Sequence, residues 1–246
     1  MTRIIFLIFL LTSFLSAKSI TIAVAANVSY AIESLKKEFM STFPKTEVRV
    51  VIGSSGKLTA QIKHGAEYDI FMSADMSYPN SLFKDKKTIS KPVVYAKGSL
   101  AILSLKKRNF TNVLELLQSR GIKNIAVANP KTAPYGKATN EALTNAKVYE
   151  KISKKFVYGE SIGQTLSYVI SAADIGFVAL SSLYSEKLNY LVEGENWVGV
   201  DKSLYTPIEQ GMVMLREDEE VKAFYEFVLS ERGREIFKSF GYVLDL

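Results

Sequence analysis

The stretch ITIAVAANVSYAIESLKKEF, residues 20–39, joins a continuous apolar run to a helical repeat. Residues 20–25 are apolar except for Thr21, which is typical of a buried strand. Four apolar residues then recur at the spacing of one helix face: Ala31, Ile32, Leu35 and Phe39. A strand that leads directly into a helix predicts the first unit of an α/β fold.

The same alternation continues along the chain. A strand-like run at residues 48–52, a helical stretch through Leu58 and Ile62, and a strand at 68–72 follow. This order predicts a parallel sheet with right-handed crossovers. A second series then follows: strand-like runs at 100–103, 125–128 and 175–179, helical stretches at 113–117, 135–145 and 162–171, and two helices near the C-terminus.

No proline-rich or low-complexity linker separates the two series. We therefore expect two α/β lobes that are joined by short crossing strands, one near residues 95–98 and one near 204–207. The strand at 208–215 could belong to either lobe. The predicted division is a signal peptide at 1–17, lobe 1 at 20–97 plus 206–246, and lobe 2 at 98–205.

The composition excludes several kinds of site. The chain has 246 residues, a formal net charge of +6, no cysteine, and His64 as its one histidine. Disulfides, thiolate metal sites and histidine clusters are therefore excluded. Its lysines are spread along the chain without a run of about five or six like charges, which favours a solvated basic surface over a nucleic-acid site.

Residues 1–17 have the pattern of a secretory signal peptide. Arg3 gives a positive start, residues 4–11 form an unbroken apolar run, and Ser16 and Ala17 offer small residues for cleavage. The run is too short to span a bilayer comfortably. We expect an exported mature chain, with an uncleaved N-terminal anchor as the alternative.

Small and polar residues follow the predicted strands, at 25–29, 53–56, 73–75, 132–136 and 160–163. In open α/β sheets, ligands bind beyond the carboxyl ends of the strands, where helices begin. Asn27 and Ser55 are good N-cap types. The unpaired N–H groups and the dipole of such helix starts form an anion site that needs no charged side chain. Each junction alone is explained by helix capping, whereas several together favour a shared polar cleft.

No catalytic group is recognisable in the sequence. A serine nucleophile needs a base, and His64 lies near a predicted helix end, where it can interact with the last carbonyls. The segment 53–57 departs from the spacing of a phosphate-binding loop. Asp69, Asp75 and Glu160 form no recognisable catalytic pair. We predict a binding protein and not an enzyme, with an exported hydrolase as an alternative.

At these junctions the chain resembles the periplasmic molybdate-binding proteins of the type II solute-binding class. The resemblance is carried by residues 25–27, 54–58, 69–75, 129–136, 175–177, 223–229 and 236–242. It implies the two-lobed periplasmic-binding-protein type II fold, each lobe a mostly parallel sheet flanked by helices. It also implies capture of molybdate or tungstate in the interlobe cleft and delivery to the membrane permease of an ABC transporter. We also expect a monomer without a cofactor or a nucleic-acid partner, and a periplasmic location after export by the signal peptide.

The resemblance further implies the ligand-binding residues. Asn27 and Ser55 match positions that give a side chain and a backbone N–H at the first two helices. Ala74 matches a small residue that lies against the anion. Tyr135 and Ile162 match positions whose backbone N–H groups close the site from the second lobe. The molybdate oxyanion is then bound via Asn27, Ser55, Tyr135 and Ile162.

One position departs from this pattern. Some members donate a tyrosine hydroxyl where this chain has Ala179. The side chain of Asn27 carries two amide donors, and we hypothesise that it binds the anion in compensation. Sulfate, thiosulfate and phosphate remain alternative ligands; phosphate needs an acceptor for its remaining proton, and Asp75 or Glu160 could supply one.

Overall fold

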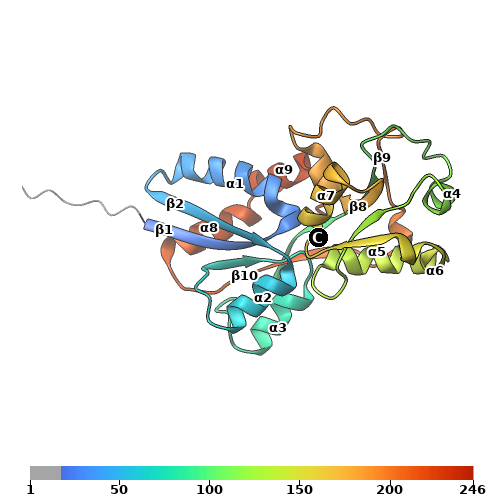
Figure 1. Cartoon of the computed structure of the whole chain (residues 1–246). Coiled ribbons are helices and arrows are strands. Elements are labelled where there is room, and N and C mark those ends of the chain that lie inside the picture. Colours follow the sequence, from blue (N-terminus) through green and yellow to red (C-terminus); the bar gives the residue numbers. More distant parts are fainter. Residues whose placement is uncertain (1–17, 246) are drawn as a thin grey trace, which may run out of the picture.

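The computed structural model describes residues 18–245, which form two lobes that each contain one five-stranded sheet (Figure 1). In spatial order, the strands of the first sheet are β2 (Thr46–Gly53), β1 (Lys18–Ala25), β3 (Ile70–Met72), β10 (Ile208–Met214) and β4 (Val93–Gly98). Those of the second sheet are β7 (Phe156–Gly159), β6 (Ile125–Ala128), β8 (Ile175–Ala179), β5 (Leu100–Leu103) and β9 (Trp197–Gly199).

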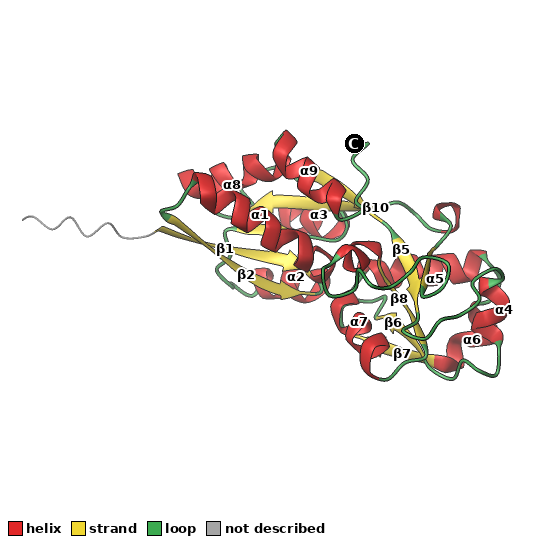
Figure 2. Cartoon of the chain, turned by 90° about the horizontal axis from the view of Figure 1, so that it is seen from above, coloured by secondary structure: helices red, strands yellow, loops and turns green. Residues whose placement is uncertain are grey.

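Helices flank both sheets, and the lobes remain side by side when the molecule is turned by 90° (Figure 2). The first lobe contains η1 (Ala26–Val28), α1 (Ser29–Thr42), α2 (Ser55–Lys63), α3 (Ser77–Lys84), α8 (Glu219–Leu229) and α9 (Glu231–Ser239). The second contains α4 (Val113–Gln118), α5 (Pro134–Asn145), α6 (Tyr149–Ile152), η2 (Ser153–Lys155), α7 (Ile162–Ser171), η3 (Leu180–Tyr184) and η4 (Lys202–Leu204).

The apolar run of β1 is buried because both faces of its sheet are covered. Successive side chains of a strand point to opposite faces. Ile22 and Val24 therefore pack with residues of α1, α8 and α9, whereas Ala23 packs on the other face with residues of α2 and α3. A strand that is covered on both sides reads as a continuous apolar run, as the sequence does here.

The second sheet is covered in the same way. Ile102 of β5 packs with residues of α4 and α5 on one face, and Leu103 packs with residues of α7 and η3 on the other. Each lobe thus has its own core on both faces of its sheet.

The predicted α/β class is confirmed, but the sheets are mixed and not mostly parallel, because β10 in the first sheet and β5 in the second each pair antiparallel with both of their neighbours. β1 is parallel to β2 and β3, and β6 is parallel to β7 and β8. The strand that could belong to either lobe is β10, which pairs antiparallel with β3 and β4 in the first sheet.

The chain passes from the first sheet to the second at the end of β4, directly after residues 95–98, near which one crossing was predicted. Lys97 and Gly98 of β4 pair with β10, and the chain then enters β5 after a single residue, Ser99. The two lobes are therefore joined here by consecutive strands without a linker.

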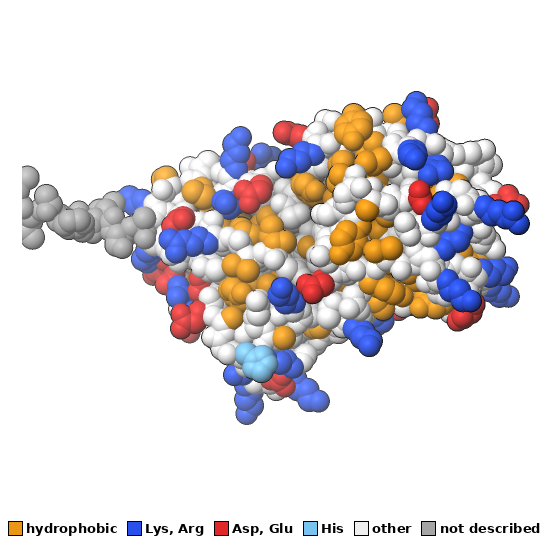
Figure 3. Space-filling view, viewed as in Figure 1, with side chains coloured by type: hydrophobic (Ala, Val, Ile, Leu, Met, Phe, Trp, Pro, Cys, Tyr) orange, Lys and Arg blue, Asp and Glu red, His pale blue; other side chains and the backbone are white. Residues whose placement is uncertain are grey.

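The charged surface is mixed. Lysine and arginine side chains are spread over both lobes on the face shown in Figure 3, with acidic groups among them. Within residues 18–245, no helix is long and apolar enough to cross a membrane. The signal peptide that is predicted for residues 1–17 lies outside the described residues.

Candidate functional site

Asn27 lies in η1, directly after β1, and is only 3% exposed. Its Nδ2 donates to Gln210 Oε1 at 2.8 Å and to Tyr242 Oη at 3.1 Å. Its carbonyl oxygen accepts from Tyr242 Oη and from Ser181 Oγ, each at 2.9 Å. Asn27 Oδ1 is buried and has no hydrogen-bond partner among the described residues. The predicted capping role is wrong, because the residue before α1 is Val28 and no side chain caps that helix.

Ser55 is the first residue of α2 and is buried. The cap of α2 is Ser54, whose Oγ accepts from the N–H of Lys57 at 3.3 Å, so the capping role predicted for Ser55 is displaced by one residue. Ser55 Oγ instead accepts from the N–H of Ala74 at 2.9 Å. A hydroxyl has one donor and two acceptor sites, so this bond leaves the Ser55 proton for another acceptor.

Tyr135 is the second residue of α5, which opens at Pro134 without a side-chain cap. The N–H groups of a first helical turn have no acceptor inside the helix. Gly136 allows α5 to begin directly against β6, because a Cβ at this position would overlap the carbonyl of Ala128. The start of α5 is thereby held at the end of a sheet strand with the Tyr135 N–H directed out of the helix.

Ile162 is the first residue of α7 and lies after the short strand β7. Ser161 caps the helix by accepting from the N–H of Gln164 at 3.2 Å. The N–H groups of Ile162 and Gly163 have no acceptor within α7. Gly163 faces the first lobe, since a Cβ there would lie 3.3 Å from Cβ of Ala26.

These helix starts meet where the lobes touch. One buried cluster contains small and apolar residues of both lobes: Ala25, Ala26 and Ala74 from the first, and Ala133, Tyr135, Ile162 and Ala179 from the second. Gly56 N–H donates across the junction to the Thr132 carbonyl at 3.0 Å. The lobes are therefore closed over the predicted residues, and Ser55 and Asn27 border the same junction.

A buried amide and three tyrosines lie beside Asn27. Gln210 is fully buried; its Oε1 accepts from Tyr95 Oη at 2.9 Å as well as from Asn27, and its Nε2 donates to Tyr135 Oη at 3.2 Å. Tyr242 Oη lies 3.3 Å from Ser181 Oγ of the second lobe. Sequence reasoning missed Gln210, Tyr95 and Tyr242, and it selected Tyr135 for its backbone N–H and not for its hydroxyl. A glutamine among the apolar residues of β10 was the one available signal.

The tyrosine hydroxyls of this network are neutral. Burial raises the pKa of Tyr95 and Tyr135 well above the usual 10.0. Burial also raises the pKa of Tyr242 to about 12, although its hydrogen bonds with Ser181 and Asn27 act in the opposite direction. All three hydroxyls keep their protons at neutral pH. The junction is thus lined by dipoles and carries no formal charge on the residues named so far.

The charged residues considered from the sequence, Asp75, Glu160 and His64, either accept other hydrogen bonds or are exposed. The carboxylate of Asp75 accepts from the N–H groups of Ser77 and Tyr78 at 3.1 and 3.4 Å, in the first turn of α3. Glu160 is exposed. His64 is the exposed residue at the C-terminal end of α2, as predicted, and lies at the opposite end of that helix from Ser55. Within the described chain, no three His, Cys, Asp or Glu side chains are grouped as a metal site requires.

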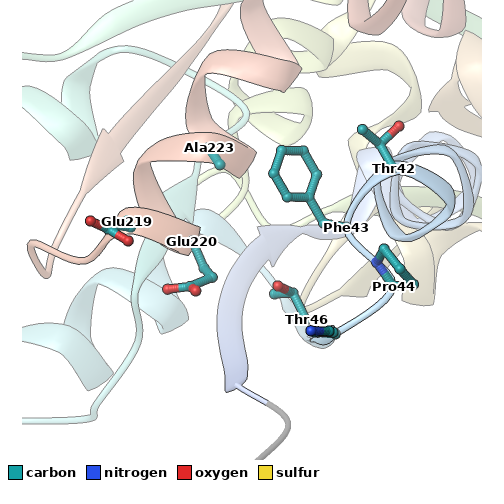
Figure 4. A pocket seen from close by; sticks show the side chains of 8 residues that line it. Thr42, Phe43, Pro44, Thr46, Glu219, Glu220 and Ala223 are labelled. Atoms are coloured by element: carbon teal, nitrogen blue, oxygen red, sulfur yellow. The ribbon is translucent and has the colours of Figure 1, made fainter. Parts of the chain in front are cut away.

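A surface hollow of about 360 Å³ lies at the far end of the first lobe, between the end of α1 and the start of α8 (Figure 4). Phe43, Glu219 and Glu220 are among its lining residues, and none of the five predicted site residues lines it. Glu220 forms an ion pair with Lys18 at 2.7 Å.

Residues 20–243 match the sequence model of the family described as bacterial extracellular solute-binding protein. The chain belongs to this family. Among relatives of this solute-binding protein, the molybdate-binding protein ModA of Azotobacter vinelandii is 33% identical over 236 residues, which cover 93% of this chain and 91% of the relative. ModA of Rhodobacter capsulatus is 31% identical, covering 94% of this chain and 90% of the relative. The predicted resemblance is confirmed.

Solved structures agree with the fold. The periplasmic molybdate-binding protein of Azotobacter vinelandii superposes on this solute-binding protein with a TM-score of 0.85 at 29% identity, covering 92% of this chain and all of that one (100%). The sulfate-binding protein SubI of Mycobacterium tuberculosis superposes with a TM-score of 0.73 at 13% identity, covering 93% and 88%. This second likeness shows the fold alone. The two-lobed fold predicted from the sequence is confirmed.

Proposed function

We propose that this solute-binding protein captures molybdate, and tungstate as its close analogue, at the junction of the two lobes. The observation that carries the proposal is that the five predicted residues, which come from five separate segments, are buried together or side by side where the lobes meet. In this proposal, Asn27 and Ser55 act from the lobe formed by residues 20–97 and 206–246, and Tyr135 and Ile162 from the lobe formed by 98–205. Ala74 provides a small apolar wall.

The donors suit a tetrahedral dianion. Ser55 Oγ already accepts from Ala74, so its proton is directed to another acceptor. The N–H groups of Ser55, Tyr135 and Ile162 lie in the first turns of three helices, where the helix dipole favours an anion. A bound anion offers acceptors only, and the neutral junction supplies donors.

Neutral donors can provide enough affinity for a carrier. A hydrogen bond to a charged group contributes about 1.5–3 kcal/mol. About five or six such bonds, less the costs of desolvation and lobe closure, are compatible with the roughly −12 kcal/mol of a nanomolar site. Since sulfate has the same charge and shape, we expect selection by cavity size.

Asn27 requires a change of orientation to act through its side chain. As placed here, both Nδ2 donors are taken by Gln210 and Tyr242, and the unpartnered atom is the acceptor Oδ1. A half-turn of the amide exchanges these atoms and presents Nδ2 where Oδ1 now lies. We propose that the anion-bound protein adopts this turned orientation.

The oligomeric state, location and partner of the protein follow from the proposed role in anion uptake. We infer that the protein acts as a monomer in the periplasm after removal of residues 1–17 and delivers its anion to the membrane permease of an ABC importer. It carries out no reaction: His64 is remote from Ser55, and Asp69 is paired with Arg216 at 3.0 Å.

A thermal-shift panel of molybdate, tungstate, sulfate and phosphate on the mature protein tests the proposal. A ligand that binds only the folded state stabilises it by about 2.7 kcal/mol at roughly 100 times its Kd. We expect a large shift with molybdate and tungstate and little with sulfate. An equal or larger shift with sulfate or phosphate would show that this anion, and not molybdate, is the ligand.

A further inference from the structure

We propose that Gln210 is a positioning residue for the anion: its amide sets which atom of Asn27 faces the ligand and links that choice to Tyr135 of the second lobe. This inference rests on the proposed oxyanion function. It assigns a role to a residue of β10 that is not itself among the proposed ligand contacts.

The contacts of Gln210 reach both lobes at once. Its Oε1 accepts from Asn27 Nδ2 at 2.8 Å and from Tyr95 Oη at 2.9 Å, both in the first lobe. Its Nε2 donates to Tyr135 Oη at 3.2 Å, in the second lobe. Gly98 of the neighbouring strand leaves room for this arrangement, because a Cβ there would overlap Tyr135 Oη and Gln210 Nε2.

The amide of Asn27 cannot turn by itself. With Gln210 Oε1 facing it, Asn27 must present Nδ2 to Gln210, which leaves Oδ1 buried without a partner. If Asn27 turns, Oδ1 faces Gln210 and needs a donor, so Gln210 must present Nε2. Gln210 Oε1 then accepts from Tyr135 Oη. Tyr95 Oη keeps an acceptor in this second state, the Ser73 carbonyl at 3.2 Å.

The two states differ in what they offer a ligand. In the first, a buried acceptor oxygen has no partner, and an oxyanion would be repelled by it. In the second, Asn27 presents two amide protons, Tyr242 Oη turns its proton from the Asn27 carbonyl to Oδ1, and that carbonyl keeps the hydrogen bond from Ser181 Oγ. An oxyanion therefore selects the second state, and Gln210 transmits the selection to the hydroxyl of Tyr135 across the lobe junction.

A double-mutant cycle tests this role. We compare molybdate Kd by calorimetric titration in wild type, Gln210→Met, Asn27→Ala and the double variant, and record the apo melting temperature of each. Gln210→Met keeps the side-chain length and removes both polar atoms. Gln61→Met is the matched control, because Gln61 accepts from Tyr68 Oη at 3.0 Å on α2, away from the junction. We expect at least a tenfold loss of affinity in Gln210→Met, no change in Gln61→Met, and at most a threefold loss when Gln210→Met is added to Asn27→Ala.

An equal loss in both backgrounds would show that Gln210 supports the fold without acting through Asn27, and unchanged affinity in Gln210→Met would remove it from the binding mechanism. If Gln210→Met does not fold, Tyr135→Phe serves instead, because it removes only the hydroxyl and keeps the backbone N–H. We expect a threefold or larger loss in Tyr135→Phe and none in the buried-tyrosine control Tyr225→Phe; equal affinities overturn the link between the lobes. Failure of wild type to bind molybdate is a separate result, which refutes the proposed function.

Discussion

The hydroxyl of Ser55 contributes to folding stability and, in the proposed function, to anion binding. Ser55→Ala removes both contributions, and two assays measure them separately. In Ser55→Ala, the N–H of Ala74, which lies 2.9 Å from Ser55 Oγ, is left buried without its acceptor. An unsatisfied buried donor costs about 1–3 kcal/mol of folding free energy. The proposed anion also loses one charge-assisted donor, which costs about 1–3 kcal/mol of binding, or roughly a 5- to 150-fold rise in Kd.

Ser54→Ala is the matched control. Ser54 caps α2 through the N–H of Lys57, so its loss costs about 0.5–2 kcal/mol of stability. The affinity of Ser54→Ala should stay within about twofold of wild type, well below the tenfold change that about 1.4 kcal/mol produces. Denaturant unfolding of the apo proteins and calorimetric titration with molybdate measure the two quantities independently. Wild-type affinity in Ser55→Ala, or an equal loss in both variants, would refute the assignment of the hydroxyl to the anion.

Asn27→Asp should nearly abolish molybdate binding at neutral pH, because a carboxylate replaces an amide beside a dianion, while the apo protein still melts cooperatively. Asn27→Ala should weaken binding less. Wild-type affinity of Asn27→Asp in a titration would exclude the side-chain contact. His64→Ala should leave Kd unchanged, because the residue lies at the far end of α2; a tenfold loss would contradict the helix orientation used here. The pH dependence follows from Tyr242, whose pKa burial raises from 10.0 to about 12. The stability that its buried neutral form contributes is fully present below pH 10 and is lost as the pH rises toward about 12. The apo free energy of unfolding, measured with denaturant, should therefore fall across that window. Molybdate affinity should be level from about pH 6 to 9. A change of molybdate affinity within that pH range would contradict this expectation.

The cores of both lobes were predictable from the sequence because their strands are covered on two faces. β1, β5, β6 and β8 read as apolar runs for this reason. The strands that were missed lack this signal. In β7, Val157 and Tyr158 are exposed, and β9 has only three residues. The helix α3 was missed because its sequence is largely polar and contains Pro79.

The candidate site was predictable in its positions and not in its hydrogen bonds. The rule that ligands bind beyond strand ends selects the junctions at 53–56, 132–136 and 160–163, and the family resemblance then selects Ser55, Tyr135 and Ile162 within them. Ser54 caps the helix, whereas Ser55 Oγ accepts from the N–H of Ala74, in the loop after β3. The local sequence has serine at both positions and therefore does not show which of them caps α2.

The network around Gln210 depends on contacts that are remote in the sequence. Gln210 and Asn27 are 183 positions apart, and Tyr242 and Asn27 are 215 apart. Because one sequence carries no information on such pairings, Asn27 was expected to cap a helix and point its amide at a ligand. The structure directs that amide into the network, so any side-chain contact with the anion requires the coupled half-turn.

The most direct measurement is a crystal structure of the mature protein with molybdate, in which anomalous scattering locates the metal atom. We expect one anomalous peak at the lobe junction, with oxyanion oxygens about 2.7–3.2 Å from Ser55 Oγ and from the backbone nitrogens of Tyr135 and Ile162. We also expect Asn27 Nδ2 to contact the anion and Gln210 Nε2 to contact Asn27 Oδ1. A peak elsewhere, or a protein that leaves molybdate unbound at saturating concentration, would refute molybdate capture at the lobe junction.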